Sequence, residues 1–506
     1  MTSSNQYLRL HSSDNVLIAI AALSVGQAIG RISCIDAIPA GHKVANIDIA
    51  IGQPVLKFGQ IIGLASHDIK AGQHVHEHNC VFADFKRDAV VGSDYVATNV
   101  LSKTEQATFQ GIVRADGRVA TRNMIAVMTT VNCSATVAKA IVDRLRQQVL
   151  RDYPHVDDIV AFTHPGGCGT SAKGENIELL RRTLSGYMNH PNVAGVLLLG
   201  LGCEVNQGGV LLDYAGLKQG PMLQYMNIQD AGGSRAAMER GIEMLMPMLP
   251  IANEARRQTV SANHLTLGLQ CGGSDGYSGI TANPALGAAV DLLVKNGGTA
   301  ILSETPEIYG AEQLLIRRAA SNDIADKLMS RIHWWEKYVA ATGGSMDNNP
   351  SPGNKKGGLT TILEKSLGAV AKAGTTGLMG VYEYGEHIDK HGFVFMDSPG
   401  NDPYSATGQV ASGANVICFT TGRGSVYGCK PAPSLKLTTT SDLYNRMRED
   451  MDIDCGVVLS GQVTVEQLGQ QIFQNILATA SGTKTKSEEF GFGDNEFLPW
   501  SVGAVM

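Results

Sequence analysis

The sequence predicts an α/β protein in which a small all-β domain precedes parallel-sheet domains. From Gly111 onward, apolar strand-like runs alternate with helix-like runs, an alternation typical of a parallel sheet covered by helices. Before that point, residues 7–82 contain short strand-like runs separated by glycine turns, which predicts a compact all-β module. The chain has 58 glycines and only 17% charged residues, a composition that suits an enzyme with many tight loops.

Composition and charge exclude several classes of protein. The net charge is −6 and the pI is about 6.1, so no basic face for nucleic acid is expected. No apolar run is as long as a membrane span, and the first ten residues, MTSSNQYLRL, lack the apolar core of a signal peptide. Nine cysteines are an odd number without the spacing of a disulfide framework. We therefore expect a cytoplasmic protein with reduced thiols.

The length of 506 residues predicts about two to four domains. Residues 84–110 have no sustained periodicity and are expected to form a linker or an extended arm. We therefore expect an all-β domain over residues 1–83, that linker, a middle domain over 111–260 and a C-terminal domain over 261–506. The main predicted strands beyond the linker are Ile125–Val131, Ile159–Thr163, Gly195–Leu201, Leu265–Gln270, Thr299–Ser303, Phe393–Met396 and Val416–Thr420.

The all-β domain carries a group of histidines. Gly41-His42-Lys43 comes first, and the run Gly72 to Asn79 later includes His74, His76 and His78. If His74 to His78 is a strand, its period of two places these three side chains on one face. Three imidazoles at that spacing can chelate a divalent metal or bind an anion. The alternative is an exposed strand end that binds nothing.

Four predicted strands end at a cysteine beside small or polar residues. One such cysteine would mean little, because a free cysteine is often a small buried hydrophobe. Four at the same topological position suggest that, if the strands share one sheet, thiols converge at its carboxyl edge. Thiolates there could hold iron, either as a cluster or as a single ion. These residues are Cys133, Cys168, Cys203 and Cys271.

Polar groups also gather in three glycine-rich turns of the C-terminal part. The stretch 265–284 forms strand, polar turn and helix, which is how α/β proteins present ligand-binding groups, although an ordinary βα loop would look similar. The loop 348–358 combines Pro and Gly with Asn and Lys donors and can bind carboxylates or hydroxyls, or it is simply a structured surface loop. Arg423, flanked by glycines, is a natural carboxylate clamp.

Several long blocks make the chain resemble the altronate and galactarate dehydratase family of sugar-acid lyases. They are GHKVANIDIAIGQPVLKFGQIIGLASHDIKAGQHVHEHN, RADGRVATRN, GLGCE, QCGGSDGYSGITANPALG, NPSPGNKKGG, SPGND and FTTGRG. The resemblance implies dehydration of a C6 aldonate or aldarate to a 2-keto-3-deoxy acid, dependent on iron under reducing conditions. It also implies an N-terminal β-clip domain, a middle domain that forms a homodimer, and a C-terminal Rossmann-like domain with a metal site.

Two details of the motifs bear on the substrate. GHK with HVHEHN, and SETPEIYGAEQLL, are more similar to altronate dehydratase, so D-altronate is the expected substrate and galactarate the alternative. The run His164-Pro165-Gly166-Gly167-Cys168 departs from the aromatic-glycine-cysteine expected in this family. This departure leaves the identity of the sugar acid open.

The mechanism requires removal of the proton on carbon 2 and loss of the hydroxyl on carbon 3. We expect iron, as Fe²⁺ or an iron–sulfur cluster, to act as the Lewis acid. The expected iron ligands are Cys168, Cys203 and Cys271, with or without Cys133, and Asp275 and Glu204 are alternative oxygen ligands for a single ion.

Binding and acid–base roles follow from residue type and position. Candidate bases or acids are His164, which sits at a strand end near Cys168, together with His42 and Lys43. The residues expected to bind substrate are Arg423 and Lys355 at the carboxylate, Ser274, Asn283 and Asn354 at the hydroxyls, and His74, His76 and His78 in a β-clip lid.

Two other functions compete with sugar-acid dehydration. One is a sulfo-lyase acting on a sulfonated hydroxy acid such as sulfolactate, a reaction performed by a related branch that usually carries the β-clip and main domains on separate chains. Their fusion here favours the sugar acid. The other is a non-catalytic sugar-acid binding protein, which the chemical groups at so many strand ends disfavour.

Overall fold

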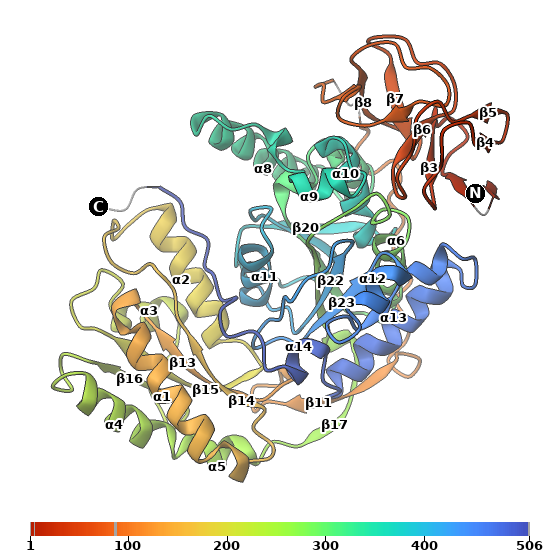
Figure 1. Ribbon diagram of the computed structural model, residues 1–506. Helices are drawn as coiled ribbons and strands as arrows, with labels where there is room; N and C mark the ends of the chain where they lie inside the picture. Colours follow the sequence, from red (N-terminus) through yellow and green to blue (C-terminus); the bar gives the residue numbers. More distant parts are fainter. Residues whose placement is uncertain (1, 5, 86–88, 504–506) are drawn as a thin grey trace.

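The structure is a computed structural model that describes residues 2–4, 6–85 and 89–503 (Figure 1). An antiparallel β domain lies at the N-terminus, and two parallel sheets flanked by helices follow. The predicted α/β class with an all-β domain in front is therefore confirmed. Among the described residues, no helix is both long and apolar enough to cross a membrane.

The N-terminal domain, residues 2–83, is built from short antiparallel strands. One sheet has the order β1-β2-β3-β6-β9, a second has the order β10-β8-β7, and β4 pairs with β5. Glycine turns separate the strands, as the sequence predicted. The strands are β1 Thr2–Ser4, β2 Tyr7–Arg9, β3 Val16–Ala19, β4 Ala28–Ile29, β5 Ile32–Ser33, β6 Lys43–Ala45, β7 Pro54–Lys57, β8 Gln60–Ala65, β9 His74–Val75 and β10 Cys80–Val81.

The histidine-bearing strand is shorter than expected. It ends at Val75, because the amide oxygen of Asn79 accepts a hydrogen bond from the backbone of His76 and holds the chain in a turn. The period of two therefore does not extend to His78, which is exposed.

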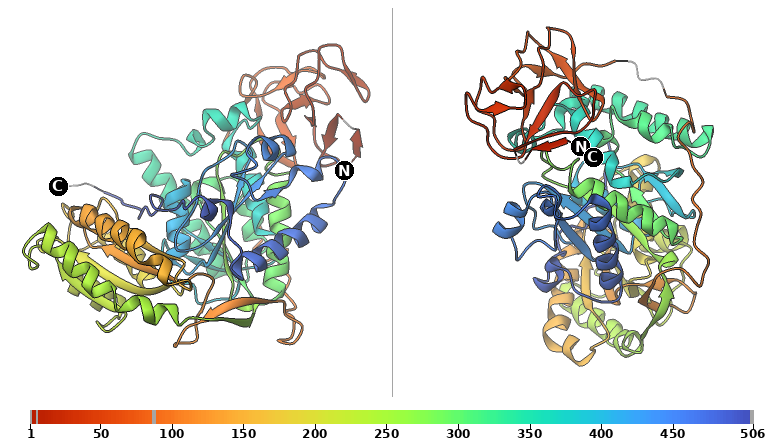
Figure 2. Two further views of the ribbon diagram at one scale, coloured as in Figure 1. Left: turned by 60° about the horizontal axis from the view of Figure 1, so that its bottom comes forward. Right: turned by 90° about the vertical axis from the view of Figure 1, so that its right-hand side faces the viewer.

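The linker crosses the molecule in an extended conformation. Beyond residue 88 it runs down one side of the C-terminal domain (Figure 2, right), and residues 86–88 lie outside the described residues. The carboxylate of Asp94 pairs with Arg317 at 2.8 Å, and the backbone of Leu101 donates to the carbonyl of Lys295. The linker thus spans from the N-terminal domain to the strands that lead into the second domain.

The second domain contains a four-stranded parallel sheet of order β14-β13-β15-β16. The central strand β13 is buried along its whole length, as expected of a parallel strand covered on both faces. A small antiparallel sheet, β12-β11-β17, leads in and out of it. Its elements are β11 Thr108–Val113, β12 Val119–Ala120, β13 Met124–Thr129, α1 Ala135–Gln148, β14 Asp158–Phe162, α2 Glu175–Met188, β15 Val193–Gly200, α3 Gly208–Ala215, β16 Leu223–Asn227, α4 Ser234–Leu245, α5 Met248–Asn253 and β17 Arg257–Ser261.

The C-terminal domain is a seven-stranded parallel sheet of order β20-β21-β19-β18-β22-β23-β24. The chain moves from β18 to β19 and outward, then returns to the other side of β18 as β22, so the strand order reverses beside β18. In open α/β sheets, ligands bind at the carboxyl ends of the strands at such a point. The strands are β18 Thr266–Cys271, β19 Thr299–Leu302, β20 Leu378–Tyr382, β21 Gly392–Met396, β22 Val416–Thr421, β23 Ser434–Thr438 and β24 Ile453–Asp454.

Helices cover both faces of this sheet (Figure 1). The predicted polar loop 348–358 contains a short helix, whose first turn is fixed by a reciprocal capping box between Ser351 and Asn354. The predicted helix Ala311–Ala319 is shorter than expected. The helices are α6 Ala282–Lys295, α7 Glu312–Ile316, α8 Asn322–Ala341, α9 Pro352–Lys356, α10 Ile362–Val370, α11 Asp402–Ala411, α12 Ser441–Arg446, α13 Val465–Ala480 and α14 Lys486–Glu489.

Candidate active site

Five buried side chains meet at the carboxyl edge of the seven-stranded sheet. We call them the charged cluster. Cys271 is the last residue of β18, while Glu304 and Glu307 follow β19 in the next loop. Two lysines come from α10 and the 3₁₀ turn that continues it, two helical turns apart and therefore on one face. The cluster is Cys271, Glu304, Glu307, Lys365 and Lys372.

Short contacts join the members of the charged cluster. The ammonium of Lys372 lies 2.8 Å from the Cys271 sulfur and 3.6 Å from a Glu304 oxygen. The Cys271 thiol donates to Glu307 at 3.4 Å, and Lys365 pairs with Glu307 at 2.8 Å. Asn349 donates to Glu307 and accepts from Lys365. Two carboxyl groups and two ammonium groups therefore share one water-excluded site.

The pKa values of the two glutamates in the cluster are shifted in opposite directions. Burial and the neighbouring charge of Glu307 raise the pKa of Glu304 well above its usual range, which favours the protonated form of that carboxyl. Burial also opposes ionisation of Glu307, but the ammonium groups of Lys365 and Lys372 outweigh it and lower the pKa of Glu307. Environments that separate two carboxyls in this way are typical of an acid–base pair.

Glu304 shows two further signs of a functional position. Its backbone has φ of +70°, a left-handed conformation that costs a non-glycine residue about 1–3 kcal/mol. Its Oε1 atom is buried without a hydrogen-bond partner. Strain and an unsatisfied buried oxygen both persist only where the surrounding structure enforces them, and they cluster at active sites.

The Cys271 thiol and the two lysines complete the electrostatics. Burial raises the pKa of the Cys271 thiol to about 12, so the sulfur keeps its proton at neutral pH. Burial opposes the charge on Lys365 and Lys372, but the acidic groups of the cluster, Glu307 above all for Lys365 and Cys271 for Lys372, outweigh it and raise both pKa values. The lysines are therefore fixed positive charges.

A small polar cavity adjoins the charged cluster beneath the N-terminal domain. Lys365 of the cluster and Asp275 of the β18–α6 turn both line it. Lys57 of the N-terminal domain closes its other side. The remaining residues that line it are Phe58, Ser274, Gly276, Ser278, Gly279, Asn283, Leu359, Glu364 and Gly368.

Of the predicted hydroxyl-binding residues, two have their amides engaged. Asn354 donates to the carbonyl of Ser274, and Asn283 bridges the Gly368 carbonyl and the Thr420 hydroxyl. These bonds fix the turns around the cavity. Their roles in binding the substrate hydroxyls stay predictions.

The other predicted residues of this domain lie at different depths. Asp275 is buried and accepts hydrogen bonds from Thr439 and Ser278, and burial raises its pKa. Lys355 pairs with Glu77 of the N-terminal domain at 3.2 Å. Arg423 is exposed. Their roles in binding metal or substrate stay predictions.

A buried ion triad attaches the N-terminal domain to the C-terminal domain. The carboxylate of Glu364 pairs with Lys43 at 2.8 Å and with Lys57 at 2.7 Å, and all three side chains are at most 1% exposed. Burial opposes the charge on Glu364, but Lys43 and Lys57 outweigh it and lower the pKa of this carboxyl. At Lys57, burial outweighs the attraction of the carboxylate and lowers the pKa of the ammonium. Lys43 is therefore engaged in docking.

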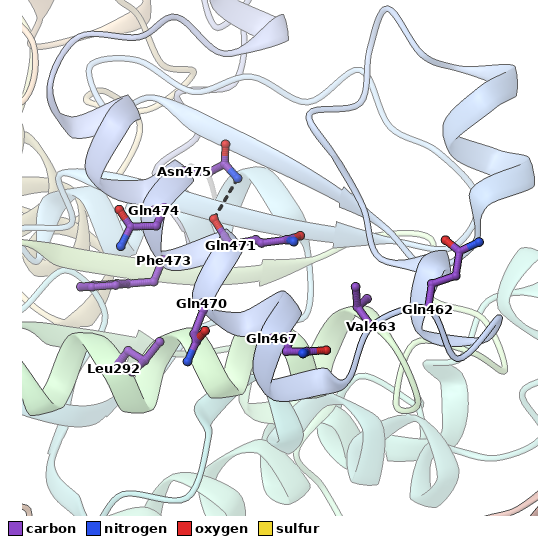
Figure 3. A pocket seen from close by; sticks show the side chains of 9 residues that line it. All are labelled: Leu292, Gln462, Val463, Gln467, Gln470, Gln471, Phe473, Gln474 and Asn475. Atoms are coloured by element: carbon purple, nitrogen blue, oxygen red, sulfur yellow. Dashed lines mark hydrogen bonds between the residues drawn. The ribbon is translucent and has the colours of Figure 1, made fainter.

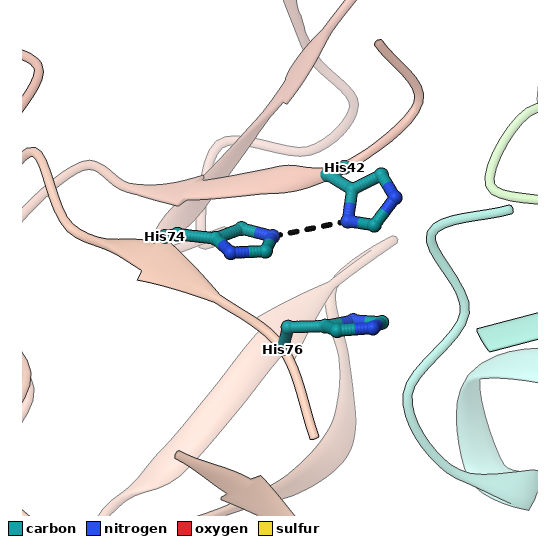
Figure 4. A group of neighbouring side chains, drawn as sticks. All are labelled: His42, His74 and His76. Carbon is teal, nitrogen blue, oxygen red and sulfur yellow. Dashed lines mark hydrogen bonds between the residues drawn. The ribbon is translucent and has the colours of Figure 1, made fainter. Parts of the chain in front are cut away.

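The imidazoles of His42, His74 and His76 face one another at the same interface (Figure 4); we call them the histidine triad. His42 Nδ1 lies 3.0 Å from His74 Nε2, and His42 Nε2 lies 3.2 Å from the carbonyl of Lys356 in the C-terminal domain. Burial, then the positive charges around them, lowers the pKa of His74 to about 3 and that of His76 to about 4. The rings are therefore neutral at physiological pH.

The four strand-end cysteines do not share one sheet, contrary to the expectation. Cys133, Cys168 and Cys203 follow β13, β14 and β15 in the second domain, whereas Cys271 ends β18 in the C-terminal domain. The topology separates them, because the chain begins a new sheet after β17. The three second-domain thiols are exposed and Cys271 is buried.

Loops hold the three second-domain cysteines at one edge. The backbone of Asn132 donates to the carbonyl of Gly166, and that of Asn206 donates to the carbonyl of Gly167. These bonds tie together the three loops that contain Cys133, Cys168 and Cys203. Glu204, next to the last of them, is buried and bonded to Thr130 and the backbone of Gly202.

The predicted base His164 lies at this second-domain edge. Its Nε2 donates to the carbonyl of Thr129, and its Nδ1 is buried without a partner. Burial lowers the pKa of His164 to about 4, so the ring is neutral. It shares a cavity lining with Cys168 and with Trp500 of the C-terminal tail.

A series of side-chain contacts connects the cysteine-bearing edge of the second-domain sheet to the charged cluster. Trp500 stacks on Trp335 with ring centroids 5.3 Å apart. Trp335 donates from Nε1 to Asp397, which also accepts from the hydroxyl of Thr305, the residue after Glu304. The cysteine edge and the charged cluster are therefore linked through packed side chains.

A separate hollow along α13 offers little chemistry. Its lining, shown in Figure 3, consists of amide and apolar side chains and contains no charged residue. We therefore assign the chemistry to the edges of the two sheets.

Three family models together match most of the chain. Residues 5–83 match the altronate/galactarate dehydratase SAF domain, residues 111–253 match the second domain of D-galactarate dehydratase/altronate hydrolase, and residues 262–505 match the C-terminal domain of D-galactarate/altronate dehydratase. The resemblance expected from the motifs thus extends over all three sheet-bearing parts.

Curated relatives cover nearly the full length. The altronate dehydratase of Bacillus subtilis (strain 168) is 33% identical over 493 residues, or 96% of this chain and 97% of that protein. The galactarate dehydratase (L-threo-forming) of Escherichia coli (strain K12) is 35% identical over 495 residues, or 96% and 95%. The chain belongs to the altronate/galactarate dehydratase family. It is a hydro-lyase of that family.

The name of a third relative describes a different elimination. The (2R)-sulfolactate sulfo-lyase subunit beta of Chromohalobacter salexigens is 29% identical over 387 residues, which cover 76% of this chain and 95% of that protein. Relatives of similar identity thus carry different substrate names, and the family alone leaves the substrate of this hydro-lyase open.

Sequence reasoning missed four residues of this hydro-lyase's charged centres as site residues. Glu304 and Glu307 follow the predicted strand Thr299–Ser303, a position that could have pointed to a role at the edge of the sheet. Lys365 and Lys372 were not singled out, although two lysines seven positions apart in the apolar run ILEKSLGAVAKAG are an available signal. Charges on the buried face of a helix require partners, and that requirement could have found them.

Proposed function

We propose that this hydro-lyase converts a six-carbon sugar acid, D-altronate, to its 2-keto-3-deoxy acid, acting in the cytoplasm as a homodimer. The observation that supports it most is the charged cluster, where burial raises the pKa of the Glu304 carboxyl while two ammonium groups lower the pKa of the neighbouring Glu307. Sequence similarity to altronate dehydratase in GHK, HVHEHN and SETPEIYGAEQLL favours the altronate substrate over galactarate.

The cluster supplies the groups that the reaction needs. The ionised Glu307 takes the proton from carbon 2, and the electron pair that remains is first delocalised into the substrate carboxylate as an enediolate. It then forms the double bond to carbon 3 as the C–O bond at carbon 3 breaks. The protonated Glu304 gives its proton to the leaving hydroxyl, which departs as water. The resulting enol becomes the 2-keto-3-deoxy acid by moving its hydroxyl proton to carbon 3.

The fixed positive charges stabilise the charge that develops during proton removal. When the carbon-2 proton is removed, the substrate carboxylate becomes an enediolate with additional negative charge, and ammonium groups already oriented in a buried site stabilise it without reorganisation. Lys365 and Lys372 occupy this position in the cluster.

Substrate entry requires movement of the N-terminal domain. The charged cluster is at most 8% exposed, and Lys57 closes the cavity beside it. We propose that the N-terminal domain opens to admit the sugar acid and closes over it, as expected for a lid that carries His42, His74, His76 and His78.

We further propose that iron is held by Cys133, Cys168 and Cys203. These thiols are exposed on loops joined to one another, and cysteine thiolates are common iron ligands. Cys271, Glu304 and Glu307 also bring three possible ligand atoms within 4.8 Å of one another, but the ammonium of Lys372 already lies 2.8 Å from the Cys271 sulfur. Iron held by Cys133, Cys168 and Cys203 would supply a Lewis acid at the edge of the second-domain sheet.

Replacing all three thiols tests the iron assignment. In anaerobically purified protein, the variant Cys133→Ser/Cys168→Ser/Cys203→Ser is expected to lose most of its iron, because no thiolate ligand remains. Iron and acid-labile sulfide are measured together with the visible spectrum. Cys271→Ser is the matched control and is expected to keep its iron. Loss of iron in Cys271→Ser, with iron retained in the triple variant, would instead place the iron at Cys271.

Turnover with three substrates tests the reaction. We expect the reduced, iron-loaded protein to form a keto-deoxy acid from D-altronate faster than from galactarate, and to release no sulfite from sulfolactate. Keto acid is measured by semicarbazide absorbance and sulfite by a thiol reagent. Preference for galactarate would change the substrate, and sulfite release would replace the dehydratase assignment. Tight binding of altronate without product would indicate a binding protein.

A further inference from the structure

We propose that the histidine triad, His42, His74 and His76, binds a divalent transition-metal ion such as Zn²⁺. One ring nitrogen from each residue lies within 4.8 Å of the other two, and His42 Nδ1 and His74 Nε2 are 3.0 Å apart. Two imidazole nitrogens on one tetrahedral zinc ion, each about 2.0–2.1 Å from the metal, lie about 3.3 Å apart. The triad therefore needs only small side-chain movements to close around an ion.

The hydrogen bonding of His42 leaves the nitrogen that a metal requires. A carbonyl oxygen can only accept, so His42 Nε2 must carry the proton that it donates to Lys356. The neutral ring then keeps its lone pair on Nδ1, which points at His74. A metal-bound histidine that donates its other ring N–H to a backbone carbonyl is the usual outer-shell arrangement.

A second observation points to a missing ligand. His76 Nδ1 is buried and has no hydrogen-bond partner. Burying an imidazole nitrogen without a partner is unfavourable, and a bound cation would satisfy it. The nearest fixed cation, Lys43, is already neutralised by Glu364 and bonded to the carbonyl of Gly358. Repulsion of an incoming ion is therefore reduced.

The donor set distinguishes this site from the proposed iron site. The histidine triad offers only imidazole nitrogens, whereas the proposed iron site offers thiols. Neutral imidazoles suit zinc, nickel, copper and iron, and three protein ligands leave a coordination position open. The proton chemistry of the charged cluster does not depend on this ion.

Occupancy of the triad is expected to favour the docked position of the N-terminal domain. The His42 ring is oriented by Lys356, which belongs to α9 of the C-terminal domain, and the neighbouring Lys355 pairs with Glu77 across the same interface. An ion that fixes the His42 ring also fixes this contact. Anything that binds the docked form more tightly shifts the equilibrium toward it.

Cobalt binding to the full-length protein tests the proposal. Chelator-treated protein is titrated with Co²⁺, and the absorbance of the bound ion gives stoichiometry and affinity. To keep thiol sites out of the signal, the titration uses the Cys133→Ser/Cys168→Ser/Cys203→Ser background. We expect one ion per chain, displaced by Zn²⁺. His74→Ala and, separately, His76→Gln are expected to weaken binding by more than about 10–100-fold, the loss caused by removing outer-shell partners alone.

Two other histidines of the N-terminal domain serve as controls. His67 is exposed and outside the triad, and His78 is exposed although its ring lies 5.5 Å from that of His74. Both alanine variants are expected to keep the ion. Circular dichroism and a urea midpoint confirm that each variant folds.

Three results would overturn the proposal. They are unchanged Co²⁺ affinity in folded His74→Ala and His76→Gln, equal loss of affinity in His78→Ala, and no binding to the parent protein. Failure here is distinguishable from failure of the proposed reaction. If only the metal proposal fails, the iron-loaded protein still forms keto acid but binds no cobalt at the triad. If only the proposed reaction fails, the protein binds cobalt at the triad but forms no keto acid.

Discussion

Glu364→Ala is expected to destabilise the protein by about 3–5 kcal/mol, because it leaves buried ammonium groups without their counter-charge. Lys43 and Lys57 share this single carboxylate, and both are almost completely buried at the junction between the N-terminal and C-terminal domains. Glu364 also accepts from the backbone and hydroxyl of Thr360, which adds to the loss. The change in free energy of unfolding is measured by urea denaturation.

Proteolysis within the 84–110 linker reports which contact has been lost. If Glu364 holds the N-terminal domain in place, the variant is cleaved there faster than the parent. Because the pKa of Glu364 is lowered in the folded protein, its contribution is present above the ordinary glutamate pKa and disappears as the pH falls.

Lys70→Ala is the matched control for this prediction. It breaks an ion pair with Asp48 in the same domain, but the two side chains are 62% and 61% exposed. Exposed pairs contribute about 0–1 kcal/mol. A loss in Glu364→Ala no larger than that in Lys70→Ala would mean that the buried triad does not attach the domain.

Much of the fold could be predicted because its determinants are local. Met124–Thr129 and Asp158–Phe162 contain apolar runs flanked by polar residues, and each forms a largely buried strand within two residues of the predicted Ile125–Val131 and Ile159–Thr163. The predicted change from short strands to alternating strands and helices at Gly111 falls inside the antiparallel strand β11, and the parallel sheet begins with β13. Hydrophobic periodicity is set by neighbours in sequence, so it needs no knowledge of the tertiary structure.

The site was harder to predict because its partners are far apart in the chain. Cys271 looked similar to Cys133, Cys168 and Cys203, since all follow strands, yet the topology places it in another sheet. The contact between Glu364 and Lys43 joins residues 321 positions apart, which no local pattern encodes. The turn after Val75 likewise depends on one hydrogen bond, which the backbone of His76 donates to the side chain of Asn79. Because the strand ends there, His78 does not lie on the same strand face as His74.

Glu307→Gln is expected to lower kcat for keto-acid formation by roughly 10²- to 10⁴-fold, the usual contribution of a positioned general base. The amide keeps the size of the side chain and its contact with Asn349, but it cannot accept the carbon-2 proton. In the parent, activity should fall at low pH as Glu307 becomes protonated and at high pH as Glu304, whose pKa is raised, loses its proton. The variant should lose the low-pH limb, which a purely structural role would leave in place.

Glu383→Gln is the matched control, because Glu383 directly follows β20 of the same sheet but is exposed and paired with Arg182. It is expected to keep nearly full kcat. Hydrogen exchange at carbon 2 separates the roles further: a protein that lacks only Glu304 can still take the proton and exchange it with solvent, whereas one that lacks Glu307 cannot. Glu304→Gln should therefore retain exchange of substrate deuterium while forming little product. Equal loss of exchange in both variants would contradict the division of acid and base between the two carboxyls and would reduce the cluster to a single functional unit.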